Sequence, residues 1–468
     1  MTLVTDAQRD ARQEARRRRT VVWVVGLATV GLMFDGYDLV VYGTVVSTFL
    51  RDASQIGKVT PGTAGALGSY ALIGVLVGAL LAGTVGDILG RRKVMLTAYA
   101  WFAIGMGLTA LSTSTTMFGA LRFVTGLGVG ALVATTGALV SEYAPPGKKN
   151  LCNAITYCGV PLGSLMAALL AILLLGSIGW RGMFWIGALP LVTLLPVAIV
   201  KMPESPVWLA SRGRIEQARA ISERTGVPLA EAPTAGRAAA APERAGFAGL
   251  FGSQYWLPTL LLGLMSATGL LLVYSLNTWL PELMRRAGFN AKGSLAFLLV
   301  LNGGAVLGAL AGSRVADRFG PKPVVASCFL IGAASIGVLT FSLPLGVLLA
   351  FVAVVGLGTS GTQTLIYGFV ANYYRTNVRG AGVAWCAGFG RLGGVGGPLL
   401  GGFLIGAGLA LDSIFYVLSA LGVLGLVLTL FVPVARRPRE VTTVRVEPTP
   451  VRRTSVAGEV ATARPVTP

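Results

Sequence analysis

The sequence has no histidine and only four cysteines among its 468 residues. Histidine is the side chain that titrates near neutral pH and a common metal ligand, so its absence excludes a histidine-containing metal site. The cysteines do not form a disulfide framework, and we expect them to be buried thiols within apolar segments. No nucleotide-binding loop and no sizeable polar domain is present, which disfavours an enzyme, and we expect no cofactor. The four cysteines are Cys152, Cys158, Cys328 and Cys386.

Charged residues are also few, at 12% of the chain, whereas 54% of the residues are hydrophobic and the mean hydropathy is +0.73. A helix that crosses a bilayer needs about 20 mainly apolar residues. Twelve segments fit this requirement, and the 64 glycines are concentrated in them, as is typical of closely packed membrane helices. The sequence therefore predicts an all-α polytopic membrane protein with twelve transmembrane helices. The segments are 21–47, 62–85, 94–112, 116–140, 151–176, 183–200, 255–279, 293–313, 323–342, 345–369, 376–404 and 411–433.

The net charge of +19 is distributed unevenly between these segments. Of the 38 Lys and Arg residues, 30 fall in the two tails and in the loops on one side of the membrane, and Arg122 and Arg391 fall inside spans. An excess of basic residues marks the cytoplasmic side. We therefore expect a multi-pass protein of the plasma (inner) membrane with both termini cytoplasmic and no role in nucleic-acid binding. The remaining six basic residues lie in outward loops: Arg51, Lys58, Arg181, Arg285, Arg286 and Lys292.

An internal repeat divides the chain into two halves. The loop Gly-Thr-Val-Gly-Asp-Ile-Leu-Gly-Arg-Arg-Lys at 83–93 recurs as Gly-Ser-Arg-Val-Ala-Asp-Arg-Phe-Gly-Pro-Lys at 312–322, so that Asp87 and Asp317 are 230 positions apart. The same offset relates Ser-Glu-Tyr, ending at Tyr143, to Ala-Asn-Tyr, ending at Tyr373. Many transporters are built from repeated units of this kind, so the pattern indicates a duplicated six-helix unit.

The repeat predicts five regions along the chain. They are a basic N-terminal tail (1–20), an N-terminal six-helix bundle (21–201), a cytoplasmic linker (202–253), a C-terminal six-helix bundle (254–433) and a disordered cytoplasmic tail (434–468). Within the linker, 211–225 has the pattern of a short amphipathic helix, and 227–245 has the composition of a flexible connection. Neither the linker nor the tail suggests an enzyme domain.

Two carboxylates interrupt the first apolar segment, in the sequence Asp35-Gly36-Tyr37-Asp38. An Asp at the centre of a membrane helix costs about 2.5–3.5 kcal/mol on insertion, so such residues face a protein interior or a watery cavity and are functional by default. Their three-residue spacing puts both carboxylates on one face of a helix. From the rise per residue, we expect Asp35 near the middle of the membrane and Asp38 at a depth similar to that of Arg122.

Several motifs occur together with this acidic pair. The Gly390-Arg391 pair lies in the eleventh span, and the other matching segments are 122–130, 141–145, 158–163, 203–206, 279–281, 379–385 and 397–398. Over about 20–433 the chain resembles the aromatic acid:proton symporters (benzoate and 4-hydroxybenzoate type) of the major facilitator superfamily, although 130–135 departs from their pattern. The resemblance implies the major facilitator fold, two pseudo-symmetric six-helix bundles and a monomer. It also implies import of a small aromatic carboxylate by proton symport.

The arginines inside the spans are candidates for binding the substrate carboxylate, because a guanidinium offers a planar fork that matches a carboxylate and keeps its charge. Arg391 is the first candidate and Arg122 the second, with an ion pair to Asp38 as the alternative role of Arg122. Without histidine, a carboxylate must carry the proton. We expect Asp35 to do so, with Asp38 and Glu142 as alternatives.

An aromatic acid also needs rings to pack against and a few hydrogen-bond donors. The candidates are Tyr37, Tyr274, Trp279, Asn302, Gln363, Tyr367 and Trp385. For gating at the cytoplasmic side, the candidates are Asp87 and Asp317 of the duplicated loop, with Arg91 and Arg379. We expect Asp87 and Arg379 to form a contact between the two halves.

Two alternative functions stay open at this point. One is a carrier for another organic acid or a polyol, since Pro203-Glu-Ser-Pro206 also occurs in sugar-type and organic-ion relatives, and the other is a proton-coupled exporter. A channel is disfavoured by the two-halved repeat and by buried charges of both signs.

Overall fold

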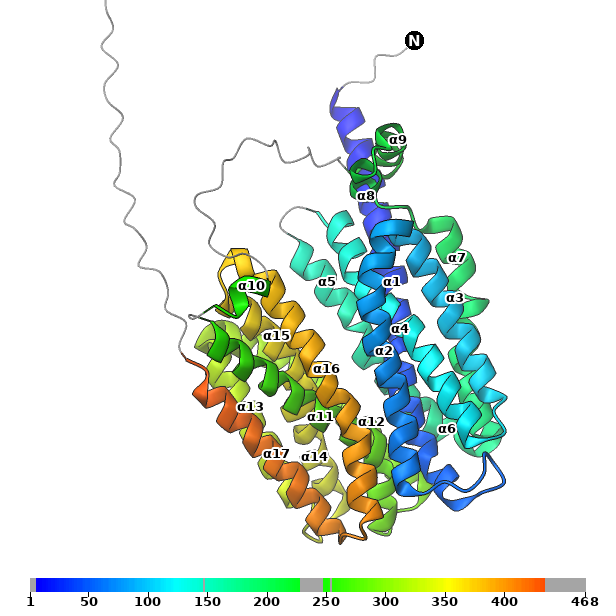
Figure 1. The fold of residues 1–468 in the computed structure, drawn as a ribbon, viewed down its shortest axis with the longest axis vertical. Coiled ribbons are helices and arrows are strands. Elements are labelled where there is room, and N and C mark those ends of the chain that lie inside the picture. The colour runs from blue at the N-terminus through cyan, green and yellow to red at the C-terminus, as the bar shows by residue number, and fades with distance from the viewer. Residues whose placement is uncertain (1–5, 146–147, 228–246, 253–254, 434–468) are drawn as a thin grey trace, which may run out of the picture. The chain divides into compact units, whose positions relative to one another are not determined.

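The computed structural model describes residues 6–145, 148–227, 247–252 and 255–433, and these ranges contain helices and no strand. In Figure 1, the helices of the first half of the sequence lie together in one group and those of the second half lie together in another. The first half comprises α1 (Asp6–Arg51), α2 (Pro61–Leu89), α3 (Arg91–Ala110), α4 (Thr115–Tyr143), α5 (Lys149–Tyr157), α6 (Gly159–Ala188), the short 3-10 helix η1 (Leu189–Leu191) and α7 (Leu194–Lys201). The connection contains α8 (Pro206–Ser211) and α9 (Ile215–Thr225). The second half comprises α10 (Phe247–Leu250), α11 (Trp256–Arg286), α12 (Ala291–Phe319), α13 (Pro321–Val338), α14 (Leu345–Gly356), the π-helix η2 (Leu357–Gly361), α15 (Thr362–Tyr373), α16 (Thr376–Gly406) and α17 (Leu411–Phe431).

The twelve predicted spans correspond to these helices. Ten helical segments in the described part of the chain are long and apolar enough to cross a membrane. One of them, Leu151–Lys201, contains two predicted spans, because Gly179 has a φ of +65° and interrupts the helix between them. The glycine-rich α16, which carries Arg391, is the twelfth span. The predicted fold is confirmed.

The duplicated loop has the same backbone structure in both halves. Gly90, with a φ of +100°, separates α2 from α3, and Gly320, with a φ of +87°, separates α12 from α13. These positive φ values favour glycine. The two glycines are also 230 positions apart, so the repeat found in the sequence is a repeat in the fold.

Parts of the connecting regions are helical. α1 begins at Asp6, so residues 6–20 continue the first membrane helix. The amphipathic helix predicted within 211–225 is present as α9, whose Thr225 carbonyl accepts a hydrogen bond from Thr20 Oγ1 (3.2 Å). The connection predicted at 227–245 lies almost wholly outside the described residues, and the C-terminal tail lies entirely outside them.

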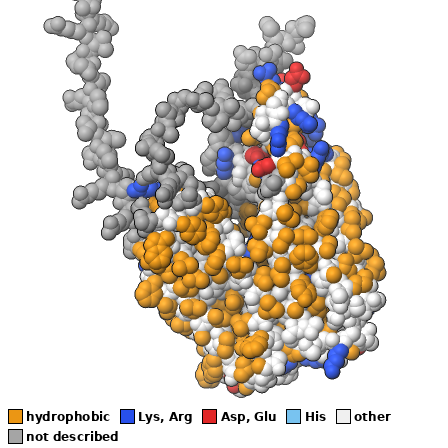
Figure 2. Space-filling model, viewed as in Figure 1, with side chains coloured by type: hydrophobic (Ala, Val, Ile, Leu, Met, Phe, Trp, Pro, Cys, Tyr) orange, Lys and Arg blue, Asp and Glu red, His pale blue; other side chains and the backbone are white. Residues whose placement is uncertain are grey.

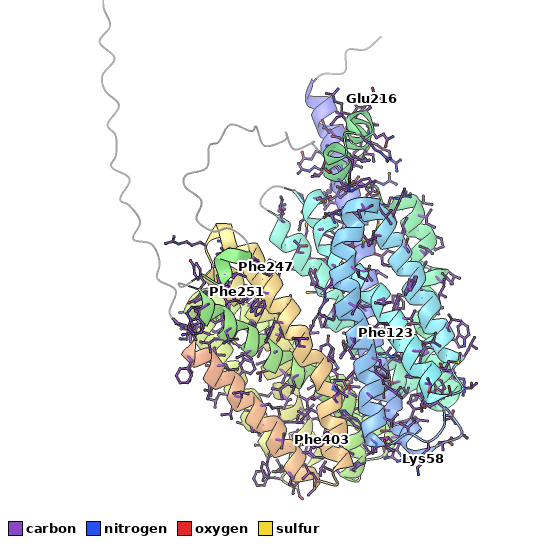
Figure 3. All side chains as sticks on the ribbon, viewed as in Figure 1. Lys58, Phe123, Glu216, Phe247, Phe251 and Phe403 are labelled. Atoms are coloured by element: carbon purple, nitrogen blue, oxygen red, sulfur yellow. The ribbon has the colours of Figure 1, made fainter. Side chains whose placement is uncertain are left out.

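The helices have two ends that differ in charge. We call the end with residues 91–93, 201–224, 314–322 and 375–379 the basic end, and the end with residues 51–60, 112–114, 285–292 and 407–411 the opposite end. In Figure 3, Glu216 of α9 marks the basic end and Lys58 marks the opposite end.

The two halves contact each other through three main helix pairs, which are α1 with α11, α2 with α16 and α6 with α12. Gly43 lies against the backbone carbonyl of Asn277, and Gly65 lies against that of Pro398; a Cβ at either glycine would overlap the carbonyl. These contacts lie on the side of the helix middle that faces the opposite end. On the same side, Ser69 Oγ donates to the Val395 carbonyl (2.7 Å) across the boundary between the halves.

Glycines also bring helices together within each half. A Cβ at Gly126 or Gly130 would overlap backbone carbonyls of α2, and a Cβ at Gly159 or Gly163 would overlap those of α1. This agrees with the close helix contacts that membrane helices form through small residues.

The outer surface of the helices is apolar, as Figure 2 shows for one face. Exposed side chains such as Leu80 (70%), Leu173 (64%) and Phe403 (69%) suit contact with lipid. The expectation of four buried thiols is correct for three cysteines but wrong for Cys158, which is exposed at the break between α5 and α6.

Candidate functional site

Five polar side chains from both halves lie within electrostatic range of one another toward the middle of the helices. Asp35 (α1) and Tyr157 (α5) come from the first half, and Arg391 (α16), Tyr274 (α11) and Tyr367 (α15) come from the second. The charge of Arg391 acts on Asp35 and on all three phenols, and that of Asp35 acts on Tyr157 and Tyr274. We call these five residues the central polar cluster.

Solvent reaches several members of this cluster. Arg391, Tyr274 and Tyr367 are partly exposed, and Tyr157 is 41% exposed, whereas Asp35 is only 6% exposed. Because these side chains interact with one another from five different helices, their exposure indicates a polar surface between the halves.

The two charged members of the cluster have no direct partner. Among the described residues, Asp35 accepts no hydrogen bond and forms no ion pair, and the same holds for the guanidinium of Arg391. A buried charge without a partner is costly. The buried Asp35 can receive a proton, and the partly exposed guanidinium of Arg391 can receive an anion.

The second pair of buried charges lies entirely within the first half. Arg122 (α4) donates to Asp38 (α1), the ion pair expected as the alternative role of Arg122, and both residues are at most 2% exposed. The guanidinium carbon of Arg122 lies 5.7 Å from the ring centre of Tyr42 and 5.9 Å from that of Phe184. A guanidinium enclosed in this way is not accessible to a substrate in this structure.

Three of the aromatic candidates pack within their own half rather than in the central polar cluster. The Tyr37 hydroxyl donates to the Met183 carbonyl (2.7 Å), and the side chain is fully buried. The indole nitrogens of Trp279 and Trp385 donate to the carbonyls of Pro398 and Thr259, each at 2.9 Å. Trp385 is also stacked on the ring of Phe389. Their hydrogen bonds hold helix pairs together.

The two amide candidates lie nearer to the cluster. Gln363 is one turn from Tyr367 on α15 and donates to Ser266 Oγ (3.0 Å). Asn302 donates to Oδ1 of Asn277 (3.0 Å). Asn277 follows Tyr274 by three residues on α11. Asn277 was missed by reasoning from the sequence.

The gating candidates lie at the basic end. Asp87 forms an ion pair with Arg91 (2.7 Å), and Glu142 lies 3.9 Å from the same guanidinium. Glu142 lies in the last turn of α4. It is therefore far along the helix from Arg122, which lies at a depth similar to that of Asp38. Asp317 and Arg379 are exposed. The expected contact between Asp87 and Arg379 is not formed in this structure.

A further charged group joins the halves at the opposite end. Glu282 (α11), which is 3% exposed, accepts hydrogen bonds from Ser47 and Arg51 of α1. It also accepts one from Arg286, one turn later on its own helix. The carboxyl of the neighbouring Asp52 accepts hydrogen bonds from Ser54 and Gln55 instead, and these bonds lower its pKa.

Neither Glu282 nor Tyr157 was identified from the sequence. Glu282 falls just beyond the predicted span 255–279, where a carboxylate is ordinary, although the two arginines that follow it are a signal of an ion pair. Tyr157 stands beside the Cys158-Gly-Val-Pro motif with no pattern of its own.

Twelve membrane-spanning helices in two repeated halves, with unpaired charges of opposite sign between the halves, define a membrane carrier of the major facilitator type. The profile of the family described as "Sugar (and other) transporter" matches residues 23–434. The chain belongs to this family, within the major facilitator superfamily, and is a transporter rather than an enzyme.

Individual relatives agree with this assignment. The chain is 34% identical to the benzoate transport protein of Acinetobacter baylyi over 417 residues, which cover 86% of this chain and 88% of that protein. It is also 34% identical to the gentisate transporter of Corynebacterium glutamicum over 402 residues, 85% and 84% of the two chains. The crystal structure of the D-xylose-proton symporter has the same fold, with a TM-score of 0.69 at 18% identity, covering 88% of this chain and 98% of that one.

Proposed function

We propose that this protein imports a small aromatic carboxylate, of the benzoate or hydroxybenzoate class, together with protons by alternating access. The observation that carries the proposal is the unpaired Arg391 of the second half and the unpaired Asp35 of the first, which interact at the middle of the helices. The benzoate and gentisate relatives support the substrate class.

The two charges explain coupling if the substrate and Asp35 compete for one cation. In the empty transporter, the positive charge of Arg391 offsets part of what burial and the neighbouring charge of Asp38 cost ionised Asp35. A substrate carboxylate that binds Arg391 takes up this positive charge and adds a negative one. Since two carboxylates near one another do not both remain ionised easily, proton uptake by Asp35 follows substrate binding. Anion and proton then cross together, which makes transport electroneutral if one proton accompanies each substrate.

Phenol rings at the cluster suit the rest of the substrate. Tyr274, Tyr367 and Tyr157 offer aromatic faces for the substrate ring and hydroxyl groups for its polar substituents. Gln363 lies one turn from Tyr367 on α15, and Asn302 on α12 donates to Asn277, which lies three residues from Tyr274 on α11. An aromatic acid fits this set of groups better than a sugar, which needs a larger number of buried hydrogen-bonding partners.

The distribution of basic residues supports the orientation of the protein. By the positive-inside rule, the basic end faces the cytoplasm and both termini are cytoplasmic. The glycine contacts and hydrogen bonds described above join the halves on the side of the opposite end, which supports an inward-facing state in the plasma membrane. Asp87 and Arg379 would then pair in the outward-facing state, when the basic end closes, with Asp317 in the equivalent position of the second half. We expect a monomer to carry out this cycle.

The test is uptake of labelled aromatic acids into proteoliposomes under an inward proton gradient. Benzoate, 4-hydroxybenzoate and gentisate are compared with xylose, and a protonophore removes the gradient. Accumulation of an aromatic acid that the protonophore abolishes supports the proposal. If folded protein accumulates none of the acids, the substrate class is wrong, and if it accumulates one without dependence on the proton gradient, the coupling is wrong.

A further inference from the structure

A buried carboxylate at the opposite end has partners of two different kinds. Glu282 is 3% exposed and accepts from Ser47 Oγ (2.7 Å) and from Arg51 Nη2 (3.1 and 3.3 Å). Both donors belong to α1, in the other half of the protein. Glu282 also accepts from Arg286 Nε (3.2 Å), which lies on the same helix. The two arginine side chains are 41% exposed, so water reaches the outer side of this network.

These two kinds of bond must respond differently when the halves move apart. The bonds from Ser47 and Arg51 cross between α1 and α11, and they break if the opposite end opens. The bond from Arg286 is internal to α11 and moves with Glu282 as a unit. A buried carboxylate that loses all its partners is heavily penalised, whereas one that keeps a charged partner is penalised much less.

We propose that Glu282 is the gating residue of the opposite end, with Arg51 and Ser47 as the partners that hold the gate closed and Arg286 as the partner that stabilises the carboxylate when the gate is open. This inference rests on the alternating-access cycle of the proposed function. It assigns opposite effects to two arginines that bind the same carboxylate.

The expected effects follow from which state each arginine stabilises. Arg51→Gln removes a bond found only in the closed gate, so it favours opening. Arg286→Gln removes the hydrogen-bonded cation that Glu282 keeps when the gate opens, so it favours closure. Lys58→Gln is the matched control, because it removes the same charge from an exposed position at the same end (Figure 3) and Lys58 has no bond to Glu282.

Opening can be measured without a substrate by hydrogen–deuterium exchange of the full-length protein in lipid nanodiscs. The reporter peptides cover 44–51 and 278–286, at the ends of α1 and α11. We expect Arg51→Gln to raise their exchange roughly three- to tenfold, as suits the loss of one charge-assisted bond that is partly exposed. Arg286→Gln should leave exchange at or below the wild-type level, and Lys58→Gln should match the wild type.

The outcomes separate the proposal from misfolding. No rise with Arg51→Gln, or any rise with Arg286→Gln, overturns it. The stretch 94–106 of α3, which has one buried face, serves as an internal reference, because a misfolded variant raises exchange there as well. In that event Ser47→Ala replaces Arg51→Gln, since it removes a bond between the halves without changing the charge, and it must raise exchange at the reporter peptides for the proposal to stand.

The same preparations also separate this inference from the proposed function. If the exchange pattern holds but wild-type protein accumulates no aromatic acid, the substrate assignment fails and the gate stands. If aromatic acids accumulate but the exchange pattern is absent, the gate assignment fails and the transport function stands.

Discussion

Neutralising one member of the Asp38–Arg122 pair should lower the free energy of unfolding of the first half. We expect no direct effect on proton coupling. Both side chains are at most 2% exposed, and Nε of Arg122 already lacks a hydrogen-bond partner in the described structure. Asp38→Asn therefore leaves a buried guanidinium with no counter-charge. Removing one partner of a buried ion pair costs about 3–5 kcal/mol. The Tyr42 and Phe184 rings do not offset this loss, because they already lie beside the guanidinium in the wild type.

The double variant distinguishes the loss of a pair from the loss of two independent residues. Arg122→Gln alone should cost a similar amount, because it leaves Asp38 ionised and unpaired. Asp38→Asn with Arg122→Gln removes both charges and should cost at most about 2 kcal/mol, well below the sum of the single changes. The free energy of unfolding is measured by titrating purified protein in mixed micelles with denaturing detergent.

Uptake by the fraction that remains folded completes this test. We expect the double variant to retain proton-driven accumulation, because the pair lies within one half and does not change partners when the halves move. If Asp38→Asn is as stable as the wild type and loses only proton-driven accumulation, then Asp38 and not Asp35 carries the proton, and the structural interpretation of the pair is refuted.

The remaining predictions concern the unpaired charges and the basic end. Asp35→Asn should preserve counterflow of the aromatic acid but abolish its accumulation against a gradient; normal accumulation would exclude Asp35 as the proton carrier. Arg391→Lys should raise the KM for uptake roughly 10–100-fold, because a lysine cannot form the two parallel hydrogen bonds of a guanidinium, and an unchanged KM would contradict bidentate binding. Asp87→Arg and Arg379→Asp should each reduce uptake, and combining them should restore part of it if these residues pair in the outward-facing state; no recovery in the double variant would argue against that contact.

The fold was predictable because its signals are local or periodic. Apolar length defines a span, and the offset of 230 residues defines the repeat. The glycine that ends each duplicated loop marks the turn between two helices at Gly90 and Gly320. The boundary that is least apparent in the sequence lies in α6, where a single residue, Gly179, separates two spans that otherwise read as one helix.

The site was only partly predictable, because side-chain direction depends on packing between distant segments. The spacing of Asp35 and Asp38 places them on one helix face, yet the structure gives them different surroundings. Asp38 meets Arg122 in its own half, while Asp35 interacts with Arg391 in the other. Tyr37 lies between them in the sequence, but its side chain is buried in the core, where its hydroxyl donates a hydrogen bond to the Met183 carbonyl.

The location of each buried charge relative to the boundary between the halves separates structural from functional roles. A pair inside one half, such as Asp38 with Arg122, need not change when the halves move, so we expect it to stabilise that half. A bond across the boundary, such as Arg51 with Glu282, stabilises one state over another and so sets an equilibrium. Charges of opposite sign on the two sides of the boundary that form no bond, such as Asp35 and Arg391, are available to a proton and an anionic ligand, as proposed above. A transporter needs all three arrangements. Only the last one makes movement of the halves depend on what is bound, since it alone changes its charge when substrate arrives.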